Sequence, residues 1–183
     1  MAANQSFNLR SIDIRAAFLQ AKNLEREIFL KPPPDVKKEG ILWRLKKPLY
    51  GLNDASRKFW LKIKEVFKNF GLKKVDGDEA LYYKHDKNGE LIGLMSTHVD
   101  DFSLAGTDDF LDTVTEEIKR TLDVSKIEDG RFRFTGIDIE QVEDRIELSM
   151  EEYAESLEDI LIREDKSSEP LNKEEMKTLR KYV

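Results

Sequence analysis

The sequence predicts an α+β domain in which helices pack on one face of an antiparallel sheet. Apolar residues recur at helical spacing in two segments, 54–70 and 110–122. Alternating apolar and polar residues predict strands before, between and after these segments. The order strand, helix, strand, strand, helix, strand is typical of a sheet with helices on one side.

The N-terminal part combines a strand with short irregular segments. Residues 7–14 alternate as a strand, and 16–19 predict the start of a helix or a tight turn. Residues 31–34 contain three consecutive prolines, so we expect an extended connector there, because each proline restricts the residue before it. Residues 41–45 predict another short strand.

The first long helix has candidate caps at both ends. Gly71 suits its C-terminal end because glycine adopts the left-handed backbone that helix ends favour. Asn53, Asp54 or Ser56 could cap its start with a side-chain oxygen. The aromatic residues along this helix are expected in the core.

The second half of the chain contains further strands and helices. Segments 80–84 and 91–99 predict a hairpin, with the Asn88-Gly89 pair supplying the left-handed backbone of its turn. Residues 102–106 continue as a strand into the second long helix. The other expected elements are a strand pair at 132–142 and 146–150, a helix around Tyr153 to Leu161, a loop at 166–170 and a helix at 173–183.

The composition excludes several classes of protein. There is no cysteine, which rules out disulfides, zinc fingers and thiol catalysis, and only two histidines are available for metal binding. No apolar run approaches the roughly 20 residues of a membrane span, and the first residues do not show the basic segment followed by an apolar one that a signal peptide would have. We therefore expect a soluble intracellular protein, cytoplasmic or nuclear, without a membrane partner.

The charge is distributed unevenly along the chain. Residues 1–75 carry 17 Lys and Arg against 7 Asp and Glu, whereas residues 76–183 carry 14 against 30. This asymmetry permits a phosphate-binding face in the N-terminal part despite the net charge of -6. The alternative is that the lysines form ordinary solvated helix faces.

Asp100 and Asp101 are adjacent carboxylates between two apolar strand segments. Their like charges repel, and a divalent cation would offset this repulsion. An ordinary turn with solvated side chains is the alternative. A second acidic pair, Asp108-Asp109, precedes a helix, where it is expected to cap the free amides and to need no catalytic explanation.

Asp13 lies where the first strand ends and the following turn or helix begins. Taken alone it could be a plain helix cap. A strand-end carboxylate combined with a carboxylate pair on a hairpin, however, is the arrangement that two-metal phosphoryl transfer requires.

Several ordered motifs resemble the reverse transcriptase of copia-type retrotransposons, from about residue 7 to the C-terminus. The matching blocks are Asp13 to Gln20 with Glu27 to Lys31 and Pro33, Trp43 to Leu52 with Ala55, Arg57 and Trp60, Ala80 to Tyr82, His98 to Asp101 with Leu104 to Gly106, and Phe134 to Ile137. The resemblance implies an RNA-directed DNA polymerase with a ferredoxin-like palm and partial fingers. Its partners would be an RNA or DNA template with a primer, and deoxynucleoside triphosphates.

The resemblance also implies roles for particular residues. Asp13, Asp100 and Asp101 would bind two Mg²⁺ ions, with Mn²⁺ as a substitute and the Ile14 carbonyl as an additional ligand. The expected nucleotide-binding residues are Ala16, Ala17, Phe18 and Gly51, and the expected primer contacts are His98, Val99, Phe134 and Gly136. Phe18 would crowd the sugar 2′-hydroxyl; a core phenylalanine is the alternative.

The resemblance places the palm with partial fingers at 1–163, with fingers or connector at about 19–60, and a loop with the start of a thumb or connection helix at 164–183. It implies truncation at both ends, so we expect polymerisation to require the missing fingers and thumb. His98 replaces the more common tyrosine, and Asp54 and Ser56 also depart from the family pattern.

Two other functions remain open from the sequence. The chain could be a non-catalytic nucleic-acid-binding remnant that keeps the palm scaffold. It could also be another magnesium-dependent phosphoryl-transfer enzyme, such as a nuclease or cyclase, although the Leu49-Tyr50-Gly51 block disfavours this.

Overall fold

The computed structural model describes residues 2–36, 39–143, 145–157 and 170–180. The chain divides into two compact units, residues 1–148 and 149–183, which are described separately.

The first unit is built on a six-stranded antiparallel sheet. In spatial order its strands are β4 (Lys73–Lys74), β5 (Leu81–His85), β6 (Leu91–His98), β7 (Asp101–Gly106), β1 (Asn8–Ile14) and β8 (Val124–Asp129). The central strands β6, β7, β1 and β8, with one helix after β1 and one after β7, form a ferredoxin-like βαββαβ unit. The predicted α+β fold is thereby confirmed.

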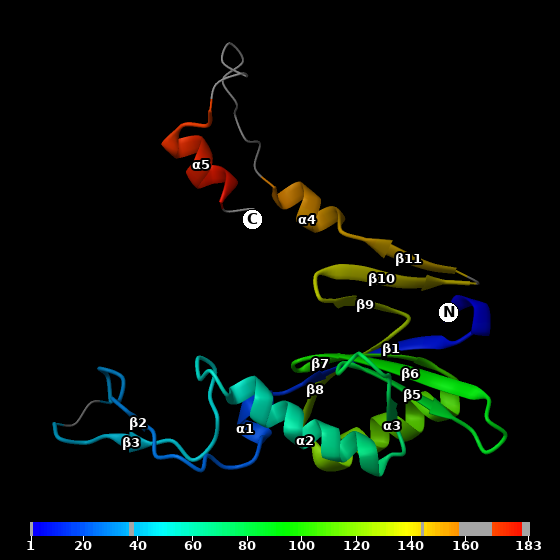
Figure 1. Ribbon diagram of the computed structural model, residues 1–183, viewed down its shortest axis with the longest axis horizontal. Helices are drawn as coiled ribbons and strands as arrows, with labels where there is room; N and C mark the ends of the chain where they lie inside the picture. Colours follow the sequence, from blue (N-terminus) through cyan, green and yellow to red (C-terminus); the bar gives the residue numbers. More distant parts are fainter. Residues whose placement is uncertain (1, 37–38, 144, 158–169, 181–183) are drawn as a thin grey trace. The chain divides into compact units, whose positions relative to one another are not determined.

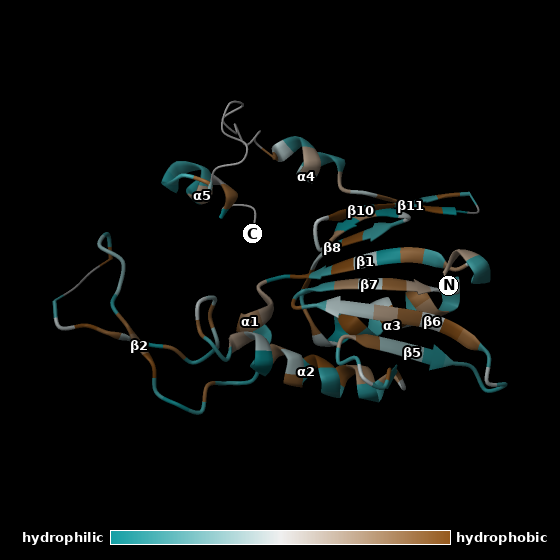
Figure 2. Ribbon diagram, turned by 45° about the horizontal axis from the view of Figure 1, so that its top comes forward, coloured by the Kyte–Doolittle hydropathy of each residue, from teal (hydrophilic) through white to brown (hydrophobic). Residues whose placement is uncertain are grey.

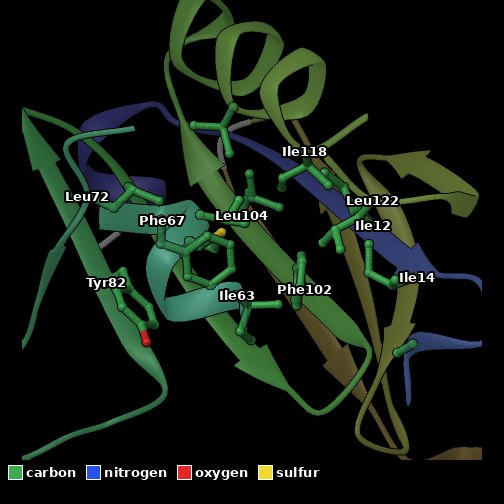
Figure 3. Packing of buried hydrophobic residues seen from close by; sticks show 14 of the residues in the cluster. Ile12, Ile14, Ile63, Phe67, Leu72, Tyr82, Phe102, Leu104, Ile118 and Leu122 are labelled. Atoms are coloured by element: carbon green, nitrogen blue, oxygen red, sulfur yellow. The ribbon is translucent and has the colours of Figure 1, made fainter. Parts of the chain in front are cut away.

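Helices α2 (Ala55–Asn69) and α3 (Asp108–Thr121) cover the same face of this sheet (Figure 1). Both carry hydrophobic and hydrophilic residues along their length (Figure 2), and their apolar side chains join those of the strands in one core. Phe67 of α2 shows this packing (Figure 3): its ring meets those of Tyr82 and Phe102 edge-on, at centroid distances of 5.1 and 5.4 Å.

The C-terminal end of α2 is capped as predicted. Gly71 has a left-handed backbone (φ 71°), its N–H donates to the Lys68 carbonyl, and the Leu72 N–H donates to the Phe67 carbonyl. These two hydrogen bonds form a Schellman motif. At the other end Asp54 occupies the cap position without a side-chain cap bond, because its carboxylate accepts from Arg26 Nη2 at 2.8 Å instead.

The start of α3 corrects the sequence prediction. Asp108 and Asp109 lie inside the first helical turn, and Thr107 is the cap, with its Oγ1 accepting from the Phe110 N–H at 3.3 Å. The acidic pair therefore does not cap the helix from outside. It lies within the first turn, where its negative charges complement the helix dipole.

A pair of glycines lets α3 approach the sheet closely. Gly93 and Gly106 are partners on β6 and β7, and a Cβ on either would collide with the ring of Phe110. The Phe110 ring is buried above this glycine pair.

A three-stranded sheet lies on the other side of the main sheet (Figure 1), formed by β9 (Arg131–Phe134), β10 (Ile137–Val142) and β11 (Arg145–Ser149). The prediction of one strand over 132–142 is wrong. Thr135 and Gly136 both have positive φ (50° and 83°) and form a two-residue hairpin turn between β9 and β10.

The small sheet is attached to β1 by apolar and polar contacts. Phe132 is buried together with Phe7 and Leu9, outside the main core. The Gln141 side chain accepts from the Leu9 N–H and donates to the Phe7 carbonyl, both at 3.0 Å. These bonds satisfy backbone groups that β1 would otherwise leave unpaired at its start.

The remaining elements of the first unit are short. They are the 3₁₀ turn η1 (Ala3–Gln5), helix α1 (Ala17–Gln20), and the two-stranded ribbon of β2 (Phe29–Leu30) and β3 (Trp43–Arg44). The strand predicted at 41–45 is thus reduced to two residues. In the β5–β6 turn only Gly89 has positive φ, not Asn88, whose N–H donates to Asp86 Oδ1.

The second unit contains α4 (Glu151–Ser156) and α5 (Lys173–Leu179). Asn172 and Glu175 form a reciprocal capping box at the start of α5, with the Glu175 N–H donating to Asn172 Oδ1 and the Asn172 N–H to Glu175 Oε2. The predicted helix around Tyr153 ends at Ser156, and Ile160, Leu161 and residues 166–169 and 181–183 lie outside the described residues. No helix among the described residues is long and apolar enough to cross a membrane.

Candidate active site

Two central strands place Asp13 and Asp101 opposite each other. They are register partners on β1 and β7. Ile12 and Ile14 point into the helix-covered core, so the alternating strand geometry puts Asp13 on the open face. Ser125 of β8 donates its hydroxyl to the Asp13 carboxylate and to its backbone carbonyl, which holds the Asp13 side chain in place.

The turn after β6 carries the third carboxylate. His98 pairs with Asp101, which leaves Val99 and Asp100 as the two turn residues. Val99 has a left-handed backbone (φ 56°), which is rare for a β-branched residue. The Ile14 N–H donates to the Asp100 carbonyl at 2.9 Å, so β1 fixes the backbone of this turn.

Proximity of the carboxylates changes their electrostatics. The pKa of Asp101 is raised, first by burial, then by the negative charges of Asp100 and Asp13 and a hydrogen bond with Asp13, while His98 acts in the opposite direction. The folded chain therefore holds like charges together at a cost, which a bound cation would offset.

Tyr50 connects this turn to α1. Its hydroxyl donates to Asp100 Oδ2 at 2.9 Å, and its ring lies against that of Phe18, with centroids 4.4 Å apart. The pKa of Tyr50 is raised, first by the hydrogen bond to Asp100, then by burial and the charges of all three aspartates. Tyr50 is not among the residues predicted for the site. The signal in the sequence was its position directly before Gly51, a predicted nucleotide-binding residue.

A cavity of about 390 Å³ opens between the main sheet and the β9–β10 hairpin. Asp13 and Asp101 line it together with Phe134, one of the predicted primer contacts. Lys126 and Arg133 also line it, and Arg133 binds Asp138 through two hydrogen bonds of 2.8 and 2.7 Å. Glu128 lines the cavity too and pairs with Lys126 at 2.8 Å, so the acidic centre is flanked by two ion pairs.

The other predicted site residues differ in exposure: some are accessible and some are buried in the core. Ala16 is exposed with a left-handed backbone (φ 45°), and Gly51 is exposed in a turn (φ 94°). His98 is exposed at the end of β6, and Gly136 lies in the turn beside Phe134. The side chains of Ile14, Ala17 and Phe18 are buried in the main core. The ligand roles of these residues stay predictions.

The donor set suits a divalent cation such as Mg²⁺. Asp13 and Asp101 oppose each other, and Mg²⁺ typically takes one or two protein carboxylates and completes its shell with water and substrate phosphates. Among the described residues, no three carboxylate or imidazole groups converge closely enough to hold an ion by themselves. Asp100 is bonded to Tyr50 instead.

The fold and these carboxylates place the chain in a class of α+β domains with an acidic centre on the open face of an antiparallel sheet. The family model described as "Reverse transcriptase (RNA-dependent DNA polymerase)" matches residues 1–166, and the chain belongs to this family. Reverse transcriptases generally use divalent metal ions, in agreement with the acidic centre.

Curated relatives confirm the resemblance to copia-type elements. The Retrovirus-related Pol polyprotein from transposon RE2 of Arabidopsis thaliana is 29% identical over 163 residues, covering 84% of this chain and 10% of the relative. The corresponding protein from transposon TNT 1-94 of Nicotiana tabacum is 26% identical over 161 residues, covering 85% and 12%. The chain thus spans about a tenth of the length of these relatives.

Among solved structures, apo telomerase from Candida tropicalis is similar to this chain, with a TM-score of 0.47 and 10% identity, covering 77% of this chain and 32% of that one.

Proposed function

We propose that this chain is the core of an RNA-directed DNA polymerase that transfers deoxynucleotides to a primer 3′-hydroxyl. The observation that carries the proposal is the opposition of Asp13 and Asp101 on the open face of the central strands, in a member of the reverse transcriptase family. Asp100 directly precedes Asp101 in the adjoining turn, and its charge contributes to the raised pKa of Asp101.

Asp13, Asp100 and Asp101 are the proposed ligands of two Mg²⁺ ions, with Mn²⁺ as a substitute and the Ile14 carbonyl as an additional ligand. When bound, such ions activate the attacking hydroxyl and stabilise the leaving pyrophosphate. The chain itself contributes positioning: β1 and β7 fix the register of Asp13 and Asp101, and Ser125 orients the Asp13 carboxylate.

The nucleotide is proposed to bind beside α1, along the backbone of Ala16, Ala17 and Gly51. Support comes from Ala16 and Gly51, which are exposed and have positive φ. The Ala16 carbonyl accepts from the Leu19 N–H at 2.9 Å, so the Ala16 N–H is the group proposed to face the nucleotide. Phe18 is buried in the main core and its ring packs on that of Tyr50, so the proposed contact with the sugar has no support from exposure of this side chain.

The primer end is proposed to lie in the cavity beneath the β9–β10 hairpin. Phe134 lines this cavity with Asp13 and Asp101, and Gly136 is in the turn beside it. His98 and Val99, the other proposed primer contacts, are exposed at the β6–β7 turn and do not line the cavity. Lys126 and Arg133 also line the cavity, but they pair there with Glu128 and Asp138, so a phosphate group would have to compete with these carboxylates for the two cations.

The partners proposed on this basis are an RNA or DNA template with its primer, and deoxynucleoside triphosphates. The proposed organisation keeps the palm with partial fingers at 1–163, with fingers or connector at about 19–60, and a thumb or connection element starting within 164–183.

A chimeric enzyme tests the proposal. Residues 1–166 would replace the matching segment of the transposon RE2 polyprotein, and extension of a DNA primer on an RNA template would be measured with Mg²⁺, beside the unmodified RE2 protein as a positive control. We expect extension by the chimera. Asp101→Asn should lower its rate by roughly 10²–10³-fold, because a charge-stabilising group is lost.

Asp109→Asn is the matched control, since Asp109 is an exposed acidic residue in the first turn of α3. It should leave extension unchanged. If the chimera binds primer–template but does not extend it, the chain is a nucleic-acid-binding remnant and the polymerase proposal is wrong. If Asp101→Asn extends as fast as the parent chimera, the assignment of Asp101 to the metal site is wrong.

A further inference from the structure

Tyr50 is exposed over 58% of its surface, yet both ends of its side chain are engaged. The ring packs on Phe18, and the hydroxyl donates to the carboxylate of Asp100 at 2.9 Å. A hydrogen bond from an exposed phenol to a protein group adds little net free energy, because it replaces a hydrogen bond to water. Its fixed placement therefore depends on the ring contact, which aims the hydroxyl at Asp100.

The backbone of Asp100 is fixed, so only its side chain can change conformation. The Ile14 N–H holds its carbonyl at 2.9 Å, so the turn backbone is tied to β1. Its carboxylate can either accept from Tyr50 or approach the like-charged pair Asp13 and Asp101. The structure has the first arrangement, and no group of three acidic residues converges among the described residues.

The Tyr50 hydroxyl is suited to remain a donor in this position. A tyrosine phenol, with an ordinary pKa of about 10, is neutral at neutral pH and can donate its proton to a carboxylate. A neutral donor stabilises the Asp100 carboxylate without neutralising the charge that a cation needs.

We infer that Tyr50 is a positioning residue that holds the Asp100 carboxylate away from Asp13 and Asp101 until a divalent cation binds. The inference rests on the proposed function, because it takes the three aspartates to be the metal site. The Tyr50 ring also packs on Phe18, the proposed nucleotide-selecting residue. Tyr50 thereby contacts both the proposed metal site and the proposed nucleotide site.

This role predicts an effect that mere structural damage would not produce. The Tyr50–Asp100 bond stabilises the metal-free chain and must be given up or shared on metal binding. Tyr50→Phe keeps the ring on Phe18 but removes the bond, so it should tighten Mn²⁺ binding about fivefold, the size expected for one exposed hydrogen bond to a charged group.

The experiment measures Mn²⁺ affinity of the whole chain by electron paramagnetic resonance and by titration calorimetry. The variants are Tyr50→Phe, Asp13→Asn and Asp101→Asn, with Tyr83→Phe as the matched control. Tyr83 contacts the ring of His85 on β5 at a centroid distance of 5.1 Å. We expect Tyr83→Phe to bind like the parent and both aspartate variants to bind at least about tenfold more weakly.

The outcomes separate the two proposals. If the aspartate variants bind Mn²⁺ more weakly but Tyr50→Phe binds as the parent does or more weakly, the inference about Tyr50 is wrong and the metal assignment stands. If the parent does not bind Mn²⁺, or the aspartate variants bind as it does, the metal assignment fails and the inference falls with it.

A second measurement tests the contact without any metal. A double-mutant cycle of Tyr50→Phe and Asp100→Asn, followed by urea unfolding in a chelator, should show non-additive changes in stability. The unfolding equilibrium constant of the double variant should differ about two- to fivefold from the additive expectation. Additive changes would overturn the Tyr50–Asp100 bond on which the inference depends.

Discussion

Val99 is held in a strained backbone conformation directly beside the acidic centre. Its φ of 56° lies in the left-handed region, which a β-branched side chain tolerates poorly. Strain of this kind persists only when neighbouring contacts enforce it. Here the β6–β7 pairing and the bond from the Ile14 N–H to the Asp100 carbonyl fix the two ends of the turn.

Replacing Val99 with glycine should therefore stabilise the metal-free chain. We expect Val99→Gly to raise the free energy of unfolding by about 1 kcal/mol, because glycine adopts positive φ without steric cost. Urea unfolding measures this, and Val99→Ala, which removes the side-chain contacts but keeps a Cβ, is the control. A loss of stability in the glycine variant, equal to that in Val99→Ala, would show that the turn is not strained.

At the scale of elements, the packing of α3 on the sheet depends on the glycine pair beneath Phe110. A Cβ at Gly106 would meet the Phe110 ring and would also lie 2.8 Å from the backbone carbonyl oxygen of Ile92. The ring could move by a rotamer change, but the Ile92 backbone belongs to the paired strand β6 and cannot easily give way.

Gly106→Ala should accordingly destabilise the chain by about 1–3 kcal/mol, the usual cost of overpacking a core. Thermal or urea unfolding would measure the change. Combining it with Phe110→Leu should recover only part of the loss, since the clash with the Ile92 carbonyl remains. Wild-type stability in Gly106→Ala would mean that α3 does not pack this closely.

The β9–β10 hairpin is stabilised by the cross-strand pair of Arg133 and Asp138. The Arg133 guanidinium lowers the pKa of Asp138. A lowered folded pKa contributes stability above the unfolded value, about 3.9, and this contribution is lost as the pH falls through the folded pKa.

Asp138→Asn should therefore lower the unfolding free energy at pH 7, by a modest amount because the pair is exposed. The difference from the parent should shrink as the pH falls below about 4. Unfolding curves collected across this range provide the test. A difference that is independent of pH would show that the pair does not stabilise the hairpin through its charge.

At the scale of the whole molecule, the long elements could be predicted and the short ones could not. Helices α2 and α3 have extended amphipathic patterns, and the β5–β6–β7 strands are bounded by clear turn signals. Strand β8 was missed because its polar residues leave little alternation. The β9–β10 turn was missed because Thr135-Gly136 is not the usual Asn-Gly pair, although both residues adopt positive φ.

In the candidate site, too, some residues could be predicted from the sequence and others could not. Asp13 and Asp101 could be connected from the motifs, because the family resemblance joined residues far apart in the sequence, and the strand register brings them together. Tyr50 could not be given a role, since its contact with Asp100 depends on how the segment before α2 folds back to α1. Local periodicity carries no information about such tertiary contacts.

The net charge of -6 makes local cations decisive for binding a polyanion. Lys126 lines the central cavity and pairs with Glu128 at 2.8 Å. If it contacts a phosphate, Lys126→Gln should weaken primer–template binding and reduce the slope of log affinity against log salt by about one. Fluorescence anisotropy over a salt series measures this, and an unchanged slope would remove Lys126 from the interface.

The central claim is that Asp13 and Asp101 form a divalent metal site on the open face of the sheet. Anomalous diffraction from crystals of this chain grown with Mn²⁺ tests it directly. We expect an anomalous peak between the two carboxylates, with distances of roughly 2.0–2.3 Å from the Mn²⁺ ion to the carboxylate oxygens. The peak should be lost in Asp13→Asn crystals. A peak elsewhere in the chain, or crystals saturated with Mn²⁺ that show none between Asp13 and Asp101, would contradict it.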